Sequence, residues 1–251
     1  MAKTLQDIRL QLQRGEVTSE KLVEEALASV KSSEGQGDKT FIKVYDDKAM
    51  VQAKAIDQVR KSGVELHPLA GIPISIKDLF DVAGEITLSG SIVRKKSVPA
   101  KSDAHIVSKL RAAGAILIGR TNMTEFAFSG LGINPHYGTP LNPWDRKTGR
   151  IPGGSSSGAA ISVTDNMAAA AIGTDTGGSV RIPSALCGLT GFKPTAARVS
   201  KEGAFPLSTT LDSIGPLANS VSCCSILDQT MRGAAVTVSY THLRAHETIP
   251  D

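Results

Sequence analysis

The sequence predicts an α/β fold in which a helical N-terminal segment precedes a core that contains a β-sheet. Residues 4–62 show apolar side chains at helical spacing, and from residue 69 short apolar runs alternate with helical patterns. The chain has 251 residues, of which 41% are hydrophobic and 21% charged, so it can bury a sizeable core. These observations exclude a fibrous or disordered chain.

The N-terminal segment predicts three helices. The first starts at the capping pair Thr4 and Asp7, the second begins at Ser19, and the third covers about residues 48–62. Residues 41–45 form a candidate strand between the second helix and the third.

Strands and helices are expected to alternate in the core. Residues 72–76 and 115–119 are predicted strands, with a helix over 103–113 between them. Asn122 followed by Glu125 matches a capping box and predicts the start of another helix. We interpret both residues as structural rather than catalytic.

Charge and cysteine content exclude several classes of function. The net charge of +4 is dispersed, and its one cluster, residues 94–96, is too short to predict nucleic-acid binding. Cys187, Cys223 and Cys224 form neither a disulfide framework nor a zinc-ligand pattern, so we expect buried thiols, no metal and no cofactor. Without a membrane-length apolar run or a signal-peptide core at the N-terminus, the expected location is cytoplasmic, with no membrane partner.

Two loops rich in glycine and serine predict an active site. The sequence GGSSSG occupies residues 153–158, and GTDTGGS occupies residues 173–179, with Ser179 lying 24 residues after Ser155. Glycine allows the backbone to approach a ligand closely, and successive N–H groups can face one developing negative charge. Ser179 is therefore a candidate nucleophile beside its own oxyanion hole.

A serine nucleophile needs a base, and histidine is a poor candidate here because none lies in either loop. The histidines are His67, His105, His136, His242 and His246. Lys77 is the better candidate, because alternation in GIPISIKD places it at the end of a strand, on the face opposite the isoleucines. For this segment alone, the alternative is a solvated lysine at a strand end.

Several motifs carry a resemblance to a known family. GIPISIKD, AGAILIGRTNMTEFA, NPWD, IPGGSSSGAA, GTDTGGSVRIPSALCGLTGFKPT and LDSIGPLA occur in this order between Gly71 and about Gly233. This segment resembles the amidase signature family, in which a Lys–Ser–Ser triad hydrolyses carboxamides. The resemblance implies a mixed sheet covered by helices on both faces, of which this chain holds the N-terminal half.

The resemblance assigns catalytic roles by position. Lys77 matches the catalytic lysine, Ser155 the bridging serine, and Ser179 the nucleophile. It also implies a cis Gly154–Ser155 peptide bond, with Lys77 Nζ and Ser179 Oγ each within about 2.6–3.2 Å of Ser155 Oγ, or somewhat farther without substrate. A lysine base requires burial, because burial lowers the pKa of an amine.

Further residues of the loops are expected to support this triad. The backbone N–H groups that match the oxyanion hole belong to Thr176, Gly177, Gly178 and Ser179. The side chains interpreted as positioning rather than reacting belong to Ser156, Asp175 and Arg181.

Two other nucleophiles are rejected. Residues 154–158 match the G-x-S-x-G pattern of α/β-hydrolases with Ser156 as nucleophile. That pattern should be followed by an acid and then a histidine, and the only downstream histidines lie in the C-terminal tail. Cys187 lies in the apolar stretch 185–189, which indicates a packing role.

The expected function is therefore hydrolysis of a small-molecule amide, and the resemblance leaves a homodimer open. One alternative is the glutaminase component, the A subunit, of glutamyl-tRNA(Gln) amidotransferase, which works with amidotransferase partner subunits. Residues 122–140 look more like stand-alone amidases, and Ile182 stands where that component usually has glutamine. The remaining alternative is an inactive fragment or a non-catalytic module whose glycine loops hold an anion.

The expected organisation is a helical segment at 1–65, the core at 66–233 and an atypical tail at 234–251 outside the native fold. Residues 238–248 fit nothing in the family and resemble translated adaptor sequence, with a natural helical tail as the alternative. On the first interpretation, elements that complete the sheet and the acyl pocket are missing. We then expect this chain to be poorly stable or inactive until the domain is completed.

Overall fold

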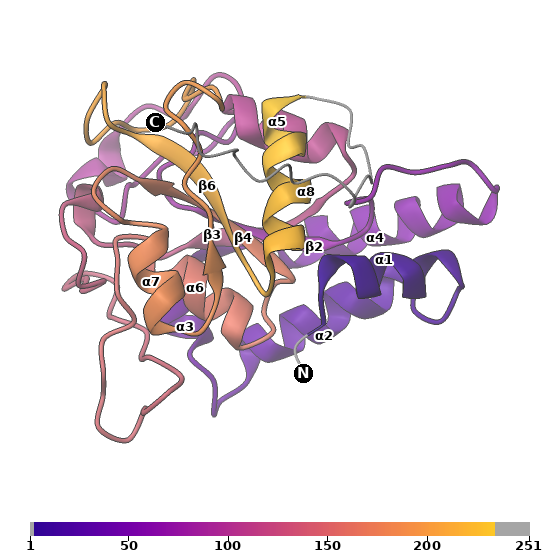
Figure 1. Ribbon diagram of the computed structural model, residues 1–251, viewed down its shortest axis with the longest axis horizontal. Coiled ribbons are helices and arrows are strands. Elements are labelled where there is room, and N and C mark those ends of the chain that lie inside the picture. Colours follow the sequence, from indigo (N-terminus) through magenta and orange to yellow (C-terminus); the bar gives the residue numbers. More distant parts are fainter. Residues whose placement is uncertain (1–2, 234–251) are drawn as a thin grey trace, which may run out of the picture.

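The computed structural model describes residues 3–233 and contains a six-stranded mixed sheet with helices on both faces (Figure 1). The strand order is β1-β3-β2-β4-β6-β5. The strands are β1 (Phe41–Val44), β2 (Pro73–Lys77), β3 (Ile116–Thr121), β4 (Ala170–Asp175), β5 (Thr190–Gly191) and β6 (Ser213–Ala218). The predicted α/β class is confirmed, while the segment 234–251 lies outside the described residues.

Eight α-helices and two short 3-10 helices accompany these strands within residues 3–233. They are α1 (Leu5–Gln13), α2 (Ser19–Lys31), α3 (Gly37–Thr40), α4 (Asp46–Lys61), α5 (His105–Ala112), α6 (Ser157–Thr164), α7 (Arg181–Leu186), α8 (Val221–Arg232), η1 (Val93–Lys96) and η2 (Glu125–Ala127). The predicted capping box of the first helix is present, with Thr4 and Asp7 each accepting from the other's backbone. The third predicted helix, α4, begins two residues earlier than expected, and β1 joins the sheet beside β3.

The helix predicted to open at Asn122 is not formed. Asn122 instead donates through Nδ2 to the carbonyls of Lys39 and Gly138, which ties together segments distant in sequence. The following residues form only the three-residue turn η2, in which Phe126 and Ala127 have φ of 51° and 60°. These left-handed values end helical propagation, so the capping-box prediction is wrong.

Packing on the two faces follows the alternation of the strands. Ile74 and Ile76 belong to a core cluster shared with α1, α5 and α8, whereas Ile116 and Ile118 pack with α2 and α4. Helices α6 and α7 lie together at one end of the sheet in Figure 1, and the cluster of α6 includes β4 and β6 residues. Because β2 pairs in parallel with both β3 and β4, the carboxyl ends of these three strands meet at one edge.

A buried ion pair fixes this edge. Arg120 Nε donates to Asp78 Oδ1 at 2.8 Å, and the two side chains are 1% and 0% exposed. Burial raises the pKa of the Asp78 carboxyl, and the Arg120 charge opposes that effect. The pair joins the end of β3 to the residue that follows Lys77.

The three cysteines lie in the packed interior, as predicted. All three cysteines are buried free thiols, and burial raises the pKa of both Cys187 and Cys224 to about 12.

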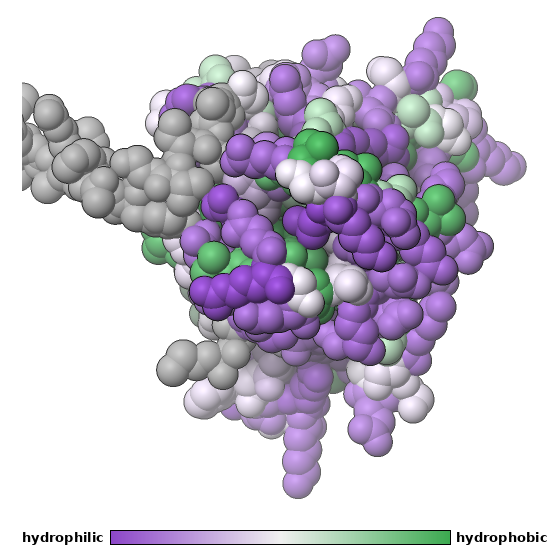
Figure 2. Space-filling view, turned by 90° about the vertical axis from the view of Figure 1, so that its right-hand side faces the viewer, coloured by the Kyte–Doolittle hydropathy of each residue, from purple (hydrophilic) through white to green (hydrophobic). Residues whose placement is uncertain are grey.

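Within residues 3–233, none of the helices combines the length and apolar character that crossing a membrane requires. Figure 2 shows that the end of the molecule carrying α1 and α4 is mostly hydrophilic, with only small apolar patches.

Removing one partner of the buried ion pair should destabilise the fold. We expect Arg120→Met to lower the free energy of unfolding by about 3–5 kcal/mol, because the buried Asp78 carboxylate then lacks its charge partner. Lys21→Met, which breaks exposed ion pairs with Glu24 and Glu25, is the control and should change it by less than about 1 kcal/mol. Urea denaturation measures both, and equal effects would contradict this account.

Candidate active site

Lys77 ends β2 with a side chain that is fully buried. Its Nζ lies 2.7 Å from Ser155 Oγ and 2.9 Å from Thr174 Oγ1. The predicted burial of Lys77 and its contact with Ser155 are both confirmed, and the solvated alternative is wrong.

The environment of Lys77 favours the neutral amine. Burial lowers the pKa of Lys77 from 10.5 to about 7, and the negative charges of Asp175 and Asp212 partly oppose this effect. A lysine with this pKa is unprotonated in a large fraction of molecules near neutral pH. It can therefore accept a proton from a hydroxyl within hydrogen-bond distance.

Close backbone packing places Ser155 against Lys77. The Gly154–Ser155 peptide bond is cis, as predicted. A Cβ added to Gly154 would lie 2.5 Å from the backbone nitrogen of Gly132, so only glycine fits before Ser155. The Ser155 carbonyl accepts from Thr124 N at 3.1 Å.

Ser179 is the member of the predicted triad with access to solvent. It is 7% exposed, whereas Lys77 and Ser155 are both 0% exposed. The carbonyl of Ser179 accepts from Ser156 N at 3.2 Å, which holds the two serine loops together. A hydrogen bond between Ser179 Oγ and Ser155 Oγ is not among those formed by the described residues. Because a looser contact is expected without substrate, their close approach stays a prediction for the substrate-bound site.

The loop that carries Ser179 is organised around the Asp175 carboxylate. Asp175 accepts from the backbone N–H groups of Gly178, Val180 and Arg181 and from the Arg181 guanidinium, at 2.8–3.2 Å. Burial alone would raise the pKa of Asp175, but the Arg181 and backbone donors outweigh it and lower the pKa. The scaffold interpretation of both residues agrees with these contacts.

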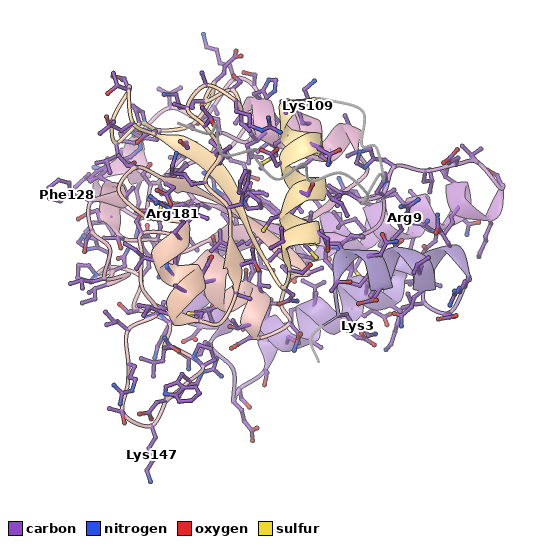
Figure 3. The ribbon with its side chains drawn as sticks, viewed as in Figure 1. Lys3, Arg9, Lys109, Phe128, Lys147 and Arg181 are labelled. Atoms are coloured by element: carbon purple, nitrogen blue, oxygen red, sulfur yellow. The ribbon has the colours of Figure 1, made fainter. Side chains whose placement is uncertain are left out.

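Arg181 reaches Asp175 from the first turn of α7. Figure 3 shows Arg181 on the same side of the molecule as Phe128, which is 81% exposed and projects outward. The guanidinium is partly exposed and forms two hydrogen bonds with Asp175, so its role here is to hold the loop.

The hydrogen bonds of the loop show which of its N–H groups are still available as oxyanion-hole donors. The Gly178 N–H already donates to Asp175 Oδ1 at 2.8 Å. Thr176, Gly177 and Ser179 remain as candidate donors. A Cβ added at Gly177 would meet no atom within 4 Å, so this part of the loop borders open space.

Two residues near Lys77 were not predicted from the sequence. Thr174 contacts the amine directly, and Asp212, just before β6, bonds Thr176 Oγ1 through its carboxylate and acts on Lys77 through its charge. Thr174 belongs to the GTDTGGS motif, but nothing in that motif singles out the Thr174 side chain as a contact of Lys77. Among the described residues, no histidine forms a hydrogen bond with Ser155 or Ser179. His136 lies elsewhere, with its Nε2 3.1 Å from Glu125 Oε1.

Sequence comparisons place these residues in a family. A family model described as Amidase matches residues 21–245. AtzE, a 1-carboxybiuret hydrolase subunit of Pseudomonas sp. (strain ADP), is 41% identical over 219 residues, covering 87% of this chain and 47% of that protein. The A subunit of glutamyl-tRNA(Gln) amidotransferase from Roseiflexus sp. (strain RS-1) is 43% identical over 231 residues, covering 92% of this chain and 46% of that protein.

Solved structures give the same result. The native peptide amidase of Stenotrophomonas maltophilia matches with a TM-score of 0.82 and 32% identity, over 97% of this chain and 51% of that one. A structure described as a vestigial protein complex that reveals the origins of an s-triazine catabolic enzyme matches with a TM-score of 0.86 and 39% identity, over 91% and 50%. The chain spans about half the length of the curated relatives it matches. From the motifs, the geometry of the serine loops and these matches, we conclude that the chain belongs to the amidase family.

Proposed function

We propose that this site hydrolyses carboxamide C–N bonds through Lys77, Ser155 and Ser179. The observation that carries the proposal is the fully buried lysine whose Nζ lies 2.7 Å from Ser155 Oγ. A buried amine without a carboxylate in hydrogen-bond contact is costly as a cation, so it serves better as a base than as half of an ion pair.

The reaction begins with two proton transfers. Neutral Lys77 takes the proton of Ser155, and Ser155 Oγ takes the proton of Ser179 as Ser179 Oγ attacks the amide carbonyl carbon. The resulting oxyanion is stabilised by N–H groups from Thr176, Gly177 and Ser179.

The second stage returns the proton and frees the enzyme. The proton held by Lys77 passes back through Ser155 to the amide nitrogen, the C–N bond breaks, and the amine leaves an ester on Ser179. A water molecule, deprotonated by the same pair, attacks this ester; the bond to Ser179 Oγ breaks, the proton returns through Ser155 to Ser179 Oγ, and the acid is released. No other base in the described residues contacts Ser155, since the hydrogen bonds of its side chain lead to Lys77.

The second candidate is the glutaminase component of an amidotransferase. It is favoured by the 39–43% identity to relatives with that name, although AtzE is 41% identical as well. The side chain at residue 182 argues against it, because Ile182 lies against the loop where a Cβ on Gly178 would meet its Cδ1 at 2.8 Å. An isoleucine there offers no hydrogen bond to a substrate amide. Ammonia release from glutamine that requires added partner subunits would favour this candidate.

A covalent probe tests the nucleophile. We expect a tagged fluorophosphonate to label Ser179, because only a serine with an activated hydroxyl reacts, and we expect Ser179→Ala to abolish labelling. Peptide mass spectrometry locates the adduct. An adduct on Ser156 would restore the α/β-hydrolase interpretation, and a chain without any adduct would support the non-catalytic alternative.

The rate of labelling should depend on pH through Lys77. Because protonated Lys77 cannot accept a proton, the rate constant should rise with pH, reach half its maximum near pH 7, and level off above about pH 8. Labelling rates between pH 5 and 9 give the midpoint, and Lys77→Met should remove the rise together with the labelling. A rate that stays flat across this range in the unmodified chain would contradict a lysine base.

A further inference from the structure

Thr174 contacts the catalytic amine but has no part in the mechanism above. It lies in β4 directly before Asp175, its side chain is 6% exposed, and its Oγ1 is 2.9 Å from Lys77 Nζ. Among the described residues, Thr174 and Ser155 supply the two hydrogen-bond partners of that nitrogen.

The valence of a neutral amine limits how these two contacts can be used. Nζ then carries two N–H donors and one lone pair, and the lone pair must face Ser155 Oγ to accept its proton. If the Thr174 hydroxyl donated to that lone pair instead, Ser155 would lose its base. The geometry is productive only when Thr174 Oγ1 accepts an N–H of Lys77.

A cavity beside Thr174 favours this productive arrangement. Thr174 lines a cavity of about 200 Å³. Its other walls carry the polar residues Lys201, Ser208, Thr209 and Asp212 and the apolar residues Ala204, Phe205, Pro206 and Ile214. A space of this size that several polar residues border can hold water, and such a water would give the Thr174 O–H an acceptor other than the lone pair of Lys77. A hydroxyl that donates into the cavity presents its oxygen to Nζ.

We propose that Thr174 is a positioning residue that accepts an N–H of Lys77 and thereby aims the lone pair of the amine at Ser155. This inference rests on the proposed function and deepens it. The same oxygen remains in contact when Lys77 becomes an ammonium during the reaction, so it stabilises the charged form as well. The other charges acting on Lys77 come from Asp175 and Asp212.

The test compares Thr174→Val with Thr174→Ser in the full chain, using a tagged fluorophosphonate as the probe. Valine keeps the shape but removes the acceptor, so we expect the plateau rate of Ser179 labelling to fall by about 10- to 100-fold. The midpoint of the pH profile should also move down by about one pH unit, because the ammonium loses a hydrogen bond. Serine keeps the hydroxyl and should restore both quantities to within a few-fold of the unmodified chain.

Thr121→Val is the matched control. Thr121 is a buried threonine at the end of the neighbouring strand β3, and its Oγ1 donates to the Ile76 carbonyl at 3.3 Å rather than to Lys77. This variant loses a buried hydroxyl as well, but it should leave the pH midpoint unchanged.

The outcomes separate this inference from the proposed function. If the unmodified chain is labelled on Ser179 and Thr174→Val shows the same rate and midpoint, the inference is overturned while the triad stands. If Thr174→Ser is as impaired as Thr174→Val, the hydroxyl is not the operative group and the inference is overturned as well. Absence of labelling in the unmodified chain overturns the proposed function itself, and the inference with it.

Discussion

The burial of one lysine amine is the constraint on which the rest of this site depends. Lys77 ends a strand that is covered on both sides, and among the described residues two neutral hydroxyls lie within hydrogen-bond distance of its Nζ. Removing an ammonium from water costs several kcal/mol, and the chain avoids most of that cost by holding the amine neutral. The neutral amine can also accept a proton. The same burial that disfavours the ammonium therefore provides the base for the proposed chemistry.

Carboxylates surround this amine without touching it. Asp175 is occupied by Arg181 and by backbone donors of the Ser179 loop, and Asp212 is occupied by Thr176 and by the backbone of residues 207 and 208. Either carboxylate in direct contact with Nζ would stabilise the ammonium and remove the base. Their hydrogen bonds shape the loops, and their charges keep the pKa of Lys77 near 7 rather than lower.

Much of this arrangement could be predicted from the sequence, but for two different reasons. Alternation placed Lys77 on the face opposite the isoleucines, and the resemblance to a family assigned Ser155 and Ser179. The contacts that involve Thr174, Asp212 and Arg120 depend on side chains that meet only in the folded chain, across separate strands and loops. Local sequence patterns carry no information on contacts between side chains that are distant in sequence.

Local sequence patterns and the structure differ at two places for similar physical reasons. Asn122 and Glu125 have the spacing of a capping box, but the left-handed backbone at Phe126 and Ala127 ends any helix there. Gly178 has the sequence position of an oxyanion donor, but the nearby carboxylate of Asp175 takes its N–H. In both cases a longer-range contact or backbone conformation overrides a rule that holds for an isolated segment.

The protonation of Lys77 is the most direct test of this account. An NMR titration of a chain with 13C-labelled lysine ε-carbons, with the Lys77 signal assigned by its loss in Lys77→Met, gives the pKa of this amine without any substrate. We expect a midpoint near 7, far below that of the exposed lysines. A midpoint close to the ordinary 10.5 would show that the amine is charged at neutral pH and would contradict its role as the base.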